Sequence, residues 1–301
     1  MSVQTYTSDT EGVRIDKWLS DVSGLSRTRV QDLCSKGLVS VNEKAVRSSY
    51  KIETGDVISM DVPEDEPLQV EAEDIPLDIL YEDSDIIVVN KPKGMVVHPA
   101  AGVTHGTLVN ALLYHCKDLS GINGVLRPGI VHRIDKDTTG CIVACKNDNA
   151  HRAIARQLED KTCHREYKAV CTGVIPHDSG LIDGPIGRDP RDRQRMCVIE
   201  GGKPARTHFQ VIERFKDSTY IDCALETGRT HQIRAHMKYI GHPLLGDEKY
   251  GGNCSYMDTQ GQVLHAYQLT LVHPSTGKEM TFEAPLPDYF STLLKLLRSG
   301  K

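Results

Sequence analysis

The stretch VHRIDKDTTGCIVAC, Val131 to Cys145, places a polar segment and a turn directly before an apolar run. If its first five residues are extended, side chains two apart share a face, so Arg133 and Asp135 point to one side and His132 and Ile134 to the other. DTTG is typical of a turn, which Asp137 can stabilise by accepting backbone N–H bonds. GCIVAC then forms a short β-strand. The stretch predicts a polar site beside a sheet; the alternative for Asp135 is a surface ion pair that contributes little stability.

Similar β-rich runs recur on both sides of this stretch, separated by glycine, proline and turn residues. They are DILYEDSDIIVVNKP (78–92), REYKAVCTGVI (165–175), RTHFQVIERF (206–215), STYIDCALETG (218–228) and VLHAYQLTLVHP (263–274). Apolar residues at helical spacing predict helices over 107–114, 149–158 and 230–240. The pattern predicts an α+β domain over residues 77–301 with a mixed, largely antiparallel sheet.

A small α+β unit is predicted for residues 1–62. Its first helix carries apolar residues at i, i+3, i+4 and i+7 and ends at Gly24. A second helix is capped by Ser26 and ends at Gly37, and two strands follow within 38–62. Residues 63–76, PEDEPLQVEAEDIP, hold three prolines and many acids and predict a linker to the larger domain.

The formal net charge of −5 hides a segregation of charge along the chain. Residues 52–90 contain thirteen acidic side chains and no Lys or Arg, whereas the remainder has 36 basic and 28 acidic residues. The remainder can therefore present a positive face to phosphates.

Membrane, metal and nucleotide-cofactor functions find little support. No apolar run is long enough to cross a bilayer, and the N-terminal residues lack the order of a secretion signal, so we expect a cytoplasmic protein without a membrane partner. The nine cysteines have no C-x-x-C spacing, so neither disulfides nor structural zinc is expected. The chain has no phosphate-binding or dinucleotide-binding glycine motif.

A second dense polar stretch, LETGRTHQIRAHMKYIGHPLLGD, spans residues 225–247. This stretch contains more polar residues than an ordinary core-facing turn would. They are Arg229, His231, Gln232, Arg234 and His236. Zinc is the obvious rival interpretation. The two histidines are five residues apart rather than four, and no H-E-x-x-H is present, so no metal site is predicted.

Four motifs of this chain, in order, resemble those of the RluA/RluD family of pseudouridine synthases. They are KPKGMVVHPA (91–100), GIVHRIDKDTTG (129–140), REYKAV (165–170) and ETGRTHQIRAHM (226–237). SRTRVQDLCSKGLVSVNEKAV (26–46) resembles an S4 RNA-binding domain. The resemblance covers nearly the whole chain and is closest to the RluD type, which acts on large-subunit ribosomal RNA. It implies the pseudouridine synthase fold and 23S-type ribosomal RNA as partner, without a cofactor or an obligatory protein partner.

The resemblance also implies roles for single residues. Asp135 matches the catalytic aspartate, and Arg133 the arginine that fills the place of a flipped-out uridine. Arg229 matches the arginine that pairs with that aspartate. Tyr167 matches the tyrosine beside the uracil, where loss of the C5 proton requires a weak base or a proton-carrying hydroxyl. His132 is expected to set local backbone geometry.

Several basic residues are expected to contact RNA. They are Arg27, Arg29 and Lys36 in the S4-like domain, and Lys91 and Lys93 in the first motif, where a structural role is the alternative. For the three S4-like residues the alternative is a solvated helix face. The arginine-rich segment 187–206 is expected to contact phosphates, with a solvated loop as the alternative.

Two other classes of function remain open at this point. One is a non-catalytic S4-domain protein that binds RNA or ribosomes. The other is a hydrolase or nuclease that uses Asp135 and Asp137 and requires a divalent metal. The joint presence of Asp135, Tyr167 and Arg229 favours the synthase.

Overall fold

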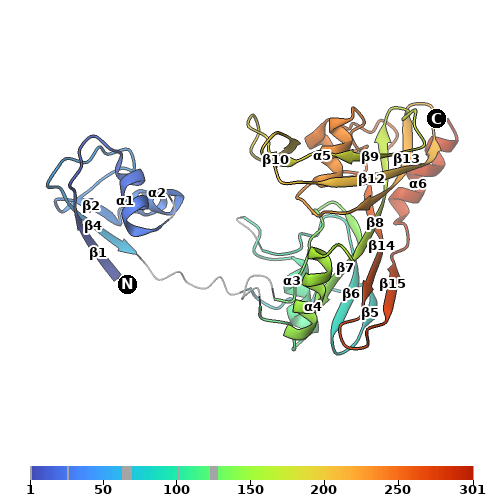
Figure 1. Ribbon diagram of the computed structural model, residues 1–301, viewed down its shortest axis with the longest axis horizontal. Helices are drawn as coiled ribbons and strands as arrows, with labels where there is room; N and C mark the ends of the chain where they lie inside the picture. The colour runs from blue at the N-terminus through green and yellow to red at the C-terminus, as the bar shows by residue number, and fades with distance from the viewer. Residues whose placement is uncertain (1, 26, 63–69, 100–101, 123–127, 301) are drawn as a thin grey trace. The chain divides into compact units, whose positions relative to one another are not determined.

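The computed structural model describes residues 2–25, 27–62, 70–99, 102–122 and 128–300 (Figure 1). The chain divides into two compact units, Met1–Pro67 and Leu68–Lys301. No helix in the described part of the chain is long and apolar enough to cross a membrane.

The small unit packs two helices against a four-stranded sheet. The helices are α1 (Ile15–Ser23) and α2 (Arg27–Ser35), and the strands are β1 (Ser2–Thr7), β2 (Val39–Val41), β3 (Lys44–Ala45) and β4 (Val57–Val62), in the order β1-β4-β2-β3. Both predicted helices are present, and Gly24 ends the first one in the left-handed conformation, at φ 72°. β1 was not predicted, and the predicted cap Ser26 lies outside the described residues.

The second half of the predicted linker lies against the larger unit. The amide of Glu73 donates a hydrogen bond to the Asn110 carbonyl, and the Asn110 side chain donates one to the Glu71 carbonyl. Val70 packs on the larger core. Residues 63–69 lie outside the described residues, so the structure describes only 70–76 of this segment.

The larger unit is built on a nine-stranded sheet, as the α+β prediction requires. Its strands are β5 (Ile79–Glu82), β6 (Ile86–Lys91), β7 (Thr139–Cys145), β8 (His164–Thr172), β9 (Ser179–Asp183), β12 (Arg206–Arg214), β13 (Ser218–Leu225), β14 (Leu264–Val272) and β15 (Glu279–Glu283). The order is β5-β6-β7-β14-β8-β13-β12-β9, with β15 also paired to β14. Among the described strands only β7 and β14 pair in parallel, so the sheet is mixed and largely antiparallel.

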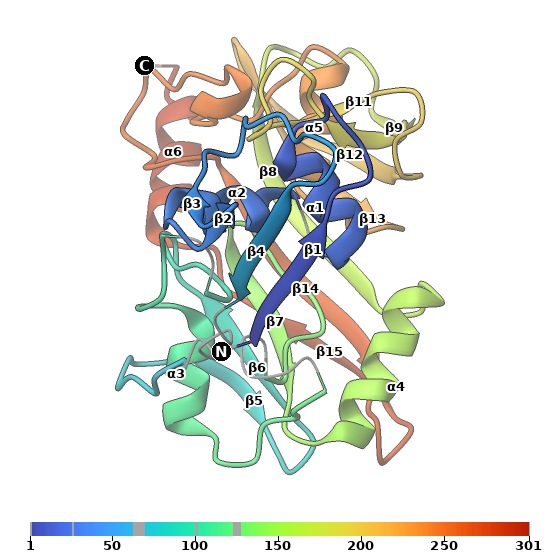
Figure 2. The ribbon, with the colours of Figure 1, turned by 90° about the vertical axis from the view of Figure 1, so that its left-hand side faces the viewer.

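Helices cover both faces of this sheet. Helices α3 (Leu108–His115) and α5 (Gln232–Tyr239) pack on one core, and α4 (Asp148–Glu159) packs on another through alternate residues of β6 and β7. Figure 2 shows α3 and α4 on opposite sides of strands β5, β6 and β7. Helix α6 (Asp288–Arg298), which was not predicted, packs on a further cluster that includes Val170 of β8.

Part of the arginine-rich segment folds back on itself rather than forming a plain loop. Strands β10 (Ile186–Arg188) and β11 (Met196–Val198) pair in an antiparallel hairpin. A short 3-10 helix, η1 (Glu248–Tyr250), contacts this hairpin. The Tyr250 hydroxyl accepts a hydrogen bond from the Met196 amide at 2.8 Å.

Gly140 fixes the course of the chain after the polar stretch. Its φ of 109° favours glycine, and a Cβ there would lie 2.1 Å from the Ala266 carbonyl oxygen. This close approach lets β7 pair with β14 at Gly140 and Ala266. The turn that carries Asp135 is thereby held beside β14.

Candidate active site

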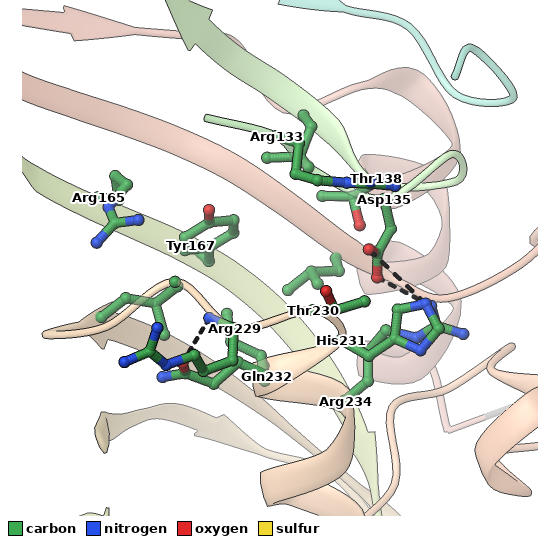
Figure 3. Close-up of a pocket in the computed structure, with 15 residues that line it drawn as sticks. Arg133, Asp135, Thr138, Arg165, Tyr167, Arg229, Thr230, His231, Gln232 and Arg234 are labelled. Atoms are coloured by element: carbon green, nitrogen blue, oxygen red, sulfur yellow. Dashed lines mark hydrogen bonds and ion pairs between the residues drawn. The ribbon is translucent and has the colours of Figure 1, made fainter. Parts of the chain in front are cut away.

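Both dense polar stretches and β8 meet in one pocket on the face of the sheet that α5 covers. The polar lining includes Arg133 and Asp135 from the segment before β7, Arg165 and Tyr167 from β8, and Arg229 and Arg234 from the second stretch (Figure 3). The 131–135 segment is not a regular strand: Arg133 and Asp135 line the pocket as predicted, but Ile134, which strict alternation would place on the opposite side, lines it as well.

Asp135 forms its ion pair with Arg234. The Arg234 Nη1 atom lies 2.9 Å from Asp135 Oδ2, and its Nε and Nη2 atoms donate to the two oxygens of Asp247 at 2.7 and 2.9 Å. Arg234 is 8 % exposed and Asp247 is 1 % exposed. Burial alone would lower the pKa of Arg234, but these two carboxylates raise it, so the guanidinium is a permanent cation.

The prediction that Arg229 pairs with Asp135 is therefore wrong. Arg229 is exposed, its Nε donates to the Pro204 carbonyl at 3.1 Å, and its amide donates to the Gln232 side chain at 2.9 Å. The same Gln232 accepts from Thr227 and so fixes the loop before α5. The spacing of the second polar stretch could have suggested Arg234 as the partner of Asp135. Residues three apart share a helix face, so Arg234 lies on the same side as His231, which also approaches Asp135.

His231, directly before α5, also lies close to the Asp135 carboxylate. It stands before α5 with φ 53°, an uncommon left-handed conformation for a residue other than glycine. Its Nδ1 lies 3.0 Å from the Tyr250 hydroxyl, and its Nε2 lies 3.9 Å from Asp135 Oδ1. Burial lowers the pKa of His231 and Asp135 raises it, with a net lowering.

Tyr167 and Arg165 form the wall of the pocket on β8. Residues two apart on a strand share a face, so both side chains point toward α5. Tyr167 is 6 % exposed, and burial raises its pKa to about 12, partly offset by the charge of Arg165. The phenol therefore keeps its proton at neutral pH, which fits a proton-carrying hydroxyl better than a base. Arg165, which sequence reasoning missed, is 9 % exposed.

His132 and Arg133 point away from each other. His132 Nε2 accepts the backbone N–H of Val143 at 3.1 Å, and burial lowers the pKa of His132 to about 3. It is thus a neutral structural acceptor, as expected. Arg133 is exposed, with its Nη1 3.2 Å from His98 Nε2, so His98 accepts from the arginine.

The first motif contains one fully buried lysine, Lys91, and one partly buried lysine, Lys93. Lys91 is fully buried, and its Nζ donates to the carbonyls of Pro92, Met95 and Lys136 at 2.7 to 2.9 Å. Lys93 Nζ lies 3.9 Å from the centre of the Tyr289 ring. Burial lowers the pKa of Lys91 to about 7 and that of Lys93 to about 8. The RNA-facing role expected for Lys91 is wrong, and its alternative, a structural role, holds.

The basic residues of the S4-like unit form ion pairs with acidic residues of α1 and α2. Arg27 Nη2 lies 3.2 Å from the buried Asp16 of α1, while Arg29 and Lys36 approach Asp32 at 3.6 and 2.9 Å. The Arg27 and Lys36 side chains are nevertheless 50 % and 57 % exposed. The two pairs with Asp32 are exposed and contribute little energy, whereas the Arg27 pair involves a fully buried carboxylate.

Two groups of metal-type donors occur among the described residues, and neither includes a residue that lines this pocket. They are Glu82, His115 and Cys116, and Asp83, Asp85 and His273.

Family models, related sequences and solved structures that resemble this chain all point to one family. Residues 85–239 match the model for RNA pseudouridylate synthases, and residues 13–58 match the S4 domain. The chain is 56 % identical over 297 residues to an uncharacterized RNA pseudouridine synthase of Bacillus subtilis, with 98 % of each chain covered. It is 45 % identical to ribosomal large subunit pseudouridine synthase D of Zymomonas mobilis, covering 97 % of this chain and 96 % of that one. The structure of human RNA pseudouridylate synthase domain containing 4 matches with a TM-score of 0.57 and 26 % identity, covering 73 % of this chain and 92 % of that one.

Proposed function

The chain belongs to the RNA pseudouridylate synthase family, and we propose that it isomerises specific uridines of large-subunit ribosomal RNA to pseudouridine, with Asp135 as the catalytic carboxylate. The observation that carries this proposal is the ion pair of Asp135 with Arg234, inside a pocket that also contains Tyr167. The pair holds one carboxylate oxygen in a fixed position while the side chain remains 17 % exposed to an incoming nucleotide.

The target uridine must leave the RNA stack before Asp135 can reach its sugar. Extruding a nucleotide costs a few kcal/mol, which contacts to the enzyme must offset. Arg133 is suited to fill the vacancy because it is exposed beside Asp135, and because a planar guanidinium can stack on bases and still bind phosphate.

The chemistry breaks the bond between C1′ and N1 and rejoins the uracil through C5. Positive charge develops on the sugar, and Asp135 either bonds to C1′ or removes the 2′ proton. Tyr167 lies beside the base, and its protonated hydroxyl can carry a proton near C5. Both routes are net isomerisations of the uridine.

The ribosomal substrate is supported by relatives and by the S4-like domain. Three relatives named ribosomal large subunit pseudouridine synthase D, from Zymomonas, Nitrosomonas and Neisseria, are 44–45 % identical over nearly the whole chain. We assign residues 1–62 to RNA docking through Arg27, Arg29 and Lys36. A ribosomal RNA substrate would place the protein in the cytoplasm.

The test is to incubate the purified full chain with large-subunit ribosomal RNA transcripts and to map pseudouridine base by base. Asp135→Asn should abolish product and leave RNA binding largely intact, because it keeps the size of the side chain and removes its charge. A transcript that the intact chain binds but leaves unmodified would contradict the proposed substrate. Undiminished activity of the chain on RNA in excess chelator would exclude the alternative of a metal-dependent hydrolase or nuclease.

A further inference from the structure

Arg165 is a buried cation without a counter-ion among residues that the structure describes. The residue is 9 % exposed, its Nε makes no hydrogen bond, and no ion pair in the described ranges includes it. Burial of an unpaired charge is costly, so such a group is retained where it meets a ligand. By contrast, Arg234 in the same pocket is bonded to two carboxylates.

The position of Arg165 relative to Tyr167 indicates which part of a nucleotide it meets. Figure 3 shows Arg165 and Asp135 on opposite sides of Tyr167. The charges of both residues act on the Tyr167 phenol, Arg165 lowering its pKa and Asp135 raising it. A uridine whose C1′ lies at Asp135 therefore extends its base across Tyr167 toward Arg165.

Three arginines of the pocket have no carboxylate partner in the described part of the chain, and they differ in exposure. Arg133 and Arg229 are exposed, whereas Arg165 is buried. Phosphates of the RNA backbone remain at the solvated mouth and match the two exposed residues. A flat, neutral base can enter the buried part of the pocket and displace water there, and a guanidinium acts more strongly once water is displaced.

We propose that Arg165 donates hydrogen bonds to a carbonyl oxygen of the extruded uracil and stabilises the negative charge that the base acquires as its glycosidic bond breaks. The electron pair of the C1′–N1 bond stays on the uracil, delocalised over N1 and the carbonyl oxygens. The same pair is returned when C1′ bonds to C5; the C5 proton then leaves and N1 gains one. This role rests on the flipping and on the Asp135 chemistry proposed above.

Gly228 sets the position of the guanidinium. A Cβ at residue 228 would lie 2.5 Å from Arg165 Nη1, although the backbone there has no left-handed φ that would require glycine. The glycine of the ETGRTH motif therefore leaves room for Arg165. Because the clash involves the far end of a flexible side chain, Gly228→Ala should fold normally and displace only the guanidinium.

The experiment measures RNA affinity and single-turnover rates at the uridines that the intact chain modifies, whichever RNA carries them, so an error in the proposed substrate does not affect it. The variants are Arg165→Gln, Arg165→Lys and Gly228→Ala. The control is Arg298→Gln, a surface arginine of α6 paired with Glu213. Each protein is also assayed on RNA in which 5-fluorouridine replaces uridine, by loss of 5-fluorouridine from nuclease digests. Fluorine stabilises the uracil anion, so the leaving group depends less on the cation.

For Arg165→Gln we expect a fall of about 10²–10³-fold in rate at saturating RNA, the usual effect of removing one donor to a developing anion, with little change in Kd. The deficit should be smaller on 5-fluorouridine RNA. Arg165→Lys should recover part of the rate, since it keeps the charge and loses the planar fork. Gly228→Ala should reduce the rate at unchanged thermal stability, and Arg298→Gln should match the intact chain.

Three results would each overturn the proposal. If Arg165→Gln raises Kd, lowers the salt dependence of binding and regains full rate at saturating RNA, the residue binds a phosphate. If the deficit is the same on both RNAs, or if Gly228→Ala has the full rate, the guanidinium does not act on the leaving uracil.

Discussion

Replacing Arg234 by Gln should reduce both the stability and the activity of the protein, and the structure separates the two effects. Arg234 makes three hydrogen bonds of 2.7 to 2.9 Å, two to Asp247 and one to Asp135. Its loss leaves the almost fully buried Asp247 without a counter-charge. Breaking a buried ion pair by removing one partner typically costs about 3–5 kcal/mol of folding free energy.

The effect on the rate comes from the third bond. A hydrogen bond to a charged group contributes about 1.5–3 kcal/mol. If this bond positions Asp135 in the transition state, its loss slows the reaction by roughly 10- to 150-fold, at about 1.4 kcal/mol for each factor of ten. Arg229→Gln, at an exposed residue, is expected to weaken RNA binding instead.

A double variant distinguishes positioning from folding. Arg234→Gln combined with Asp247→Asn removes the unpaired buried charge, so most of the lost stability should return, while Asp135 still lacks its guanidinium. Urea unfolding measures the stability, and single-turnover pseudouridine formation at saturating RNA measures the rate. Recovery of the rate together with the stability would refute the positioning role. Full activity of a folded Arg234→Gln protein would refute it as well.

Three further outcomes are expected. Burial alone would raise the pKa of Asp83, but hydrogen bonds from two backbone amides, Tyr81 and His273 hold it at about 2. Because this pKa is lowered on folding, about 2 kcal/mol of stability should be present above pH 4 and lost as the pH falls toward 2; Asp83→Asn should abolish that part of the pH dependence in acid unfolding curves. Lys91→Met should lower the free energy of unfolding by about 3 kcal/mol or more in denaturant titrations, because three buried carbonyls lose their donor. Replacing the exposed Arg191 and Arg193 of the hairpin by Gln should reduce the slope of log K against log salt by about 0.7–0.9 for each phosphate contact removed; an unchanged slope would show that the hairpin does not contact RNA.

Local sequence patterns predicted most of the secondary structure and part of the site. Helical spacing indicated α3 and α4, and β-rich runs indicated the main strands, because side-chain periodicity follows directly from backbone geometry. The same alternation placed Arg133 and Asp135 on one side, but it wrongly placed Ile134 on the other, because this segment is not a regular strand. Helix α6 and the small strands β9 and β15 were missed.

The sequence by itself determined the family, the fold class and the presence of Asp135 and Tyr167, since these depend on motifs and short-range spacing. The tertiary structure alone decided which arginine holds Asp135, because Arg234 and Arg229 lie in the same polar stretch and differ only in what they face after folding. It also decided that Lys91 is buried and that Arg165 meets no counter-ion among the residues the structure describes. The Asp135–Arg234 pair joins residues 99 positions apart, and contacts across such a distance depend on how strands and helices pack rather than on any local pattern.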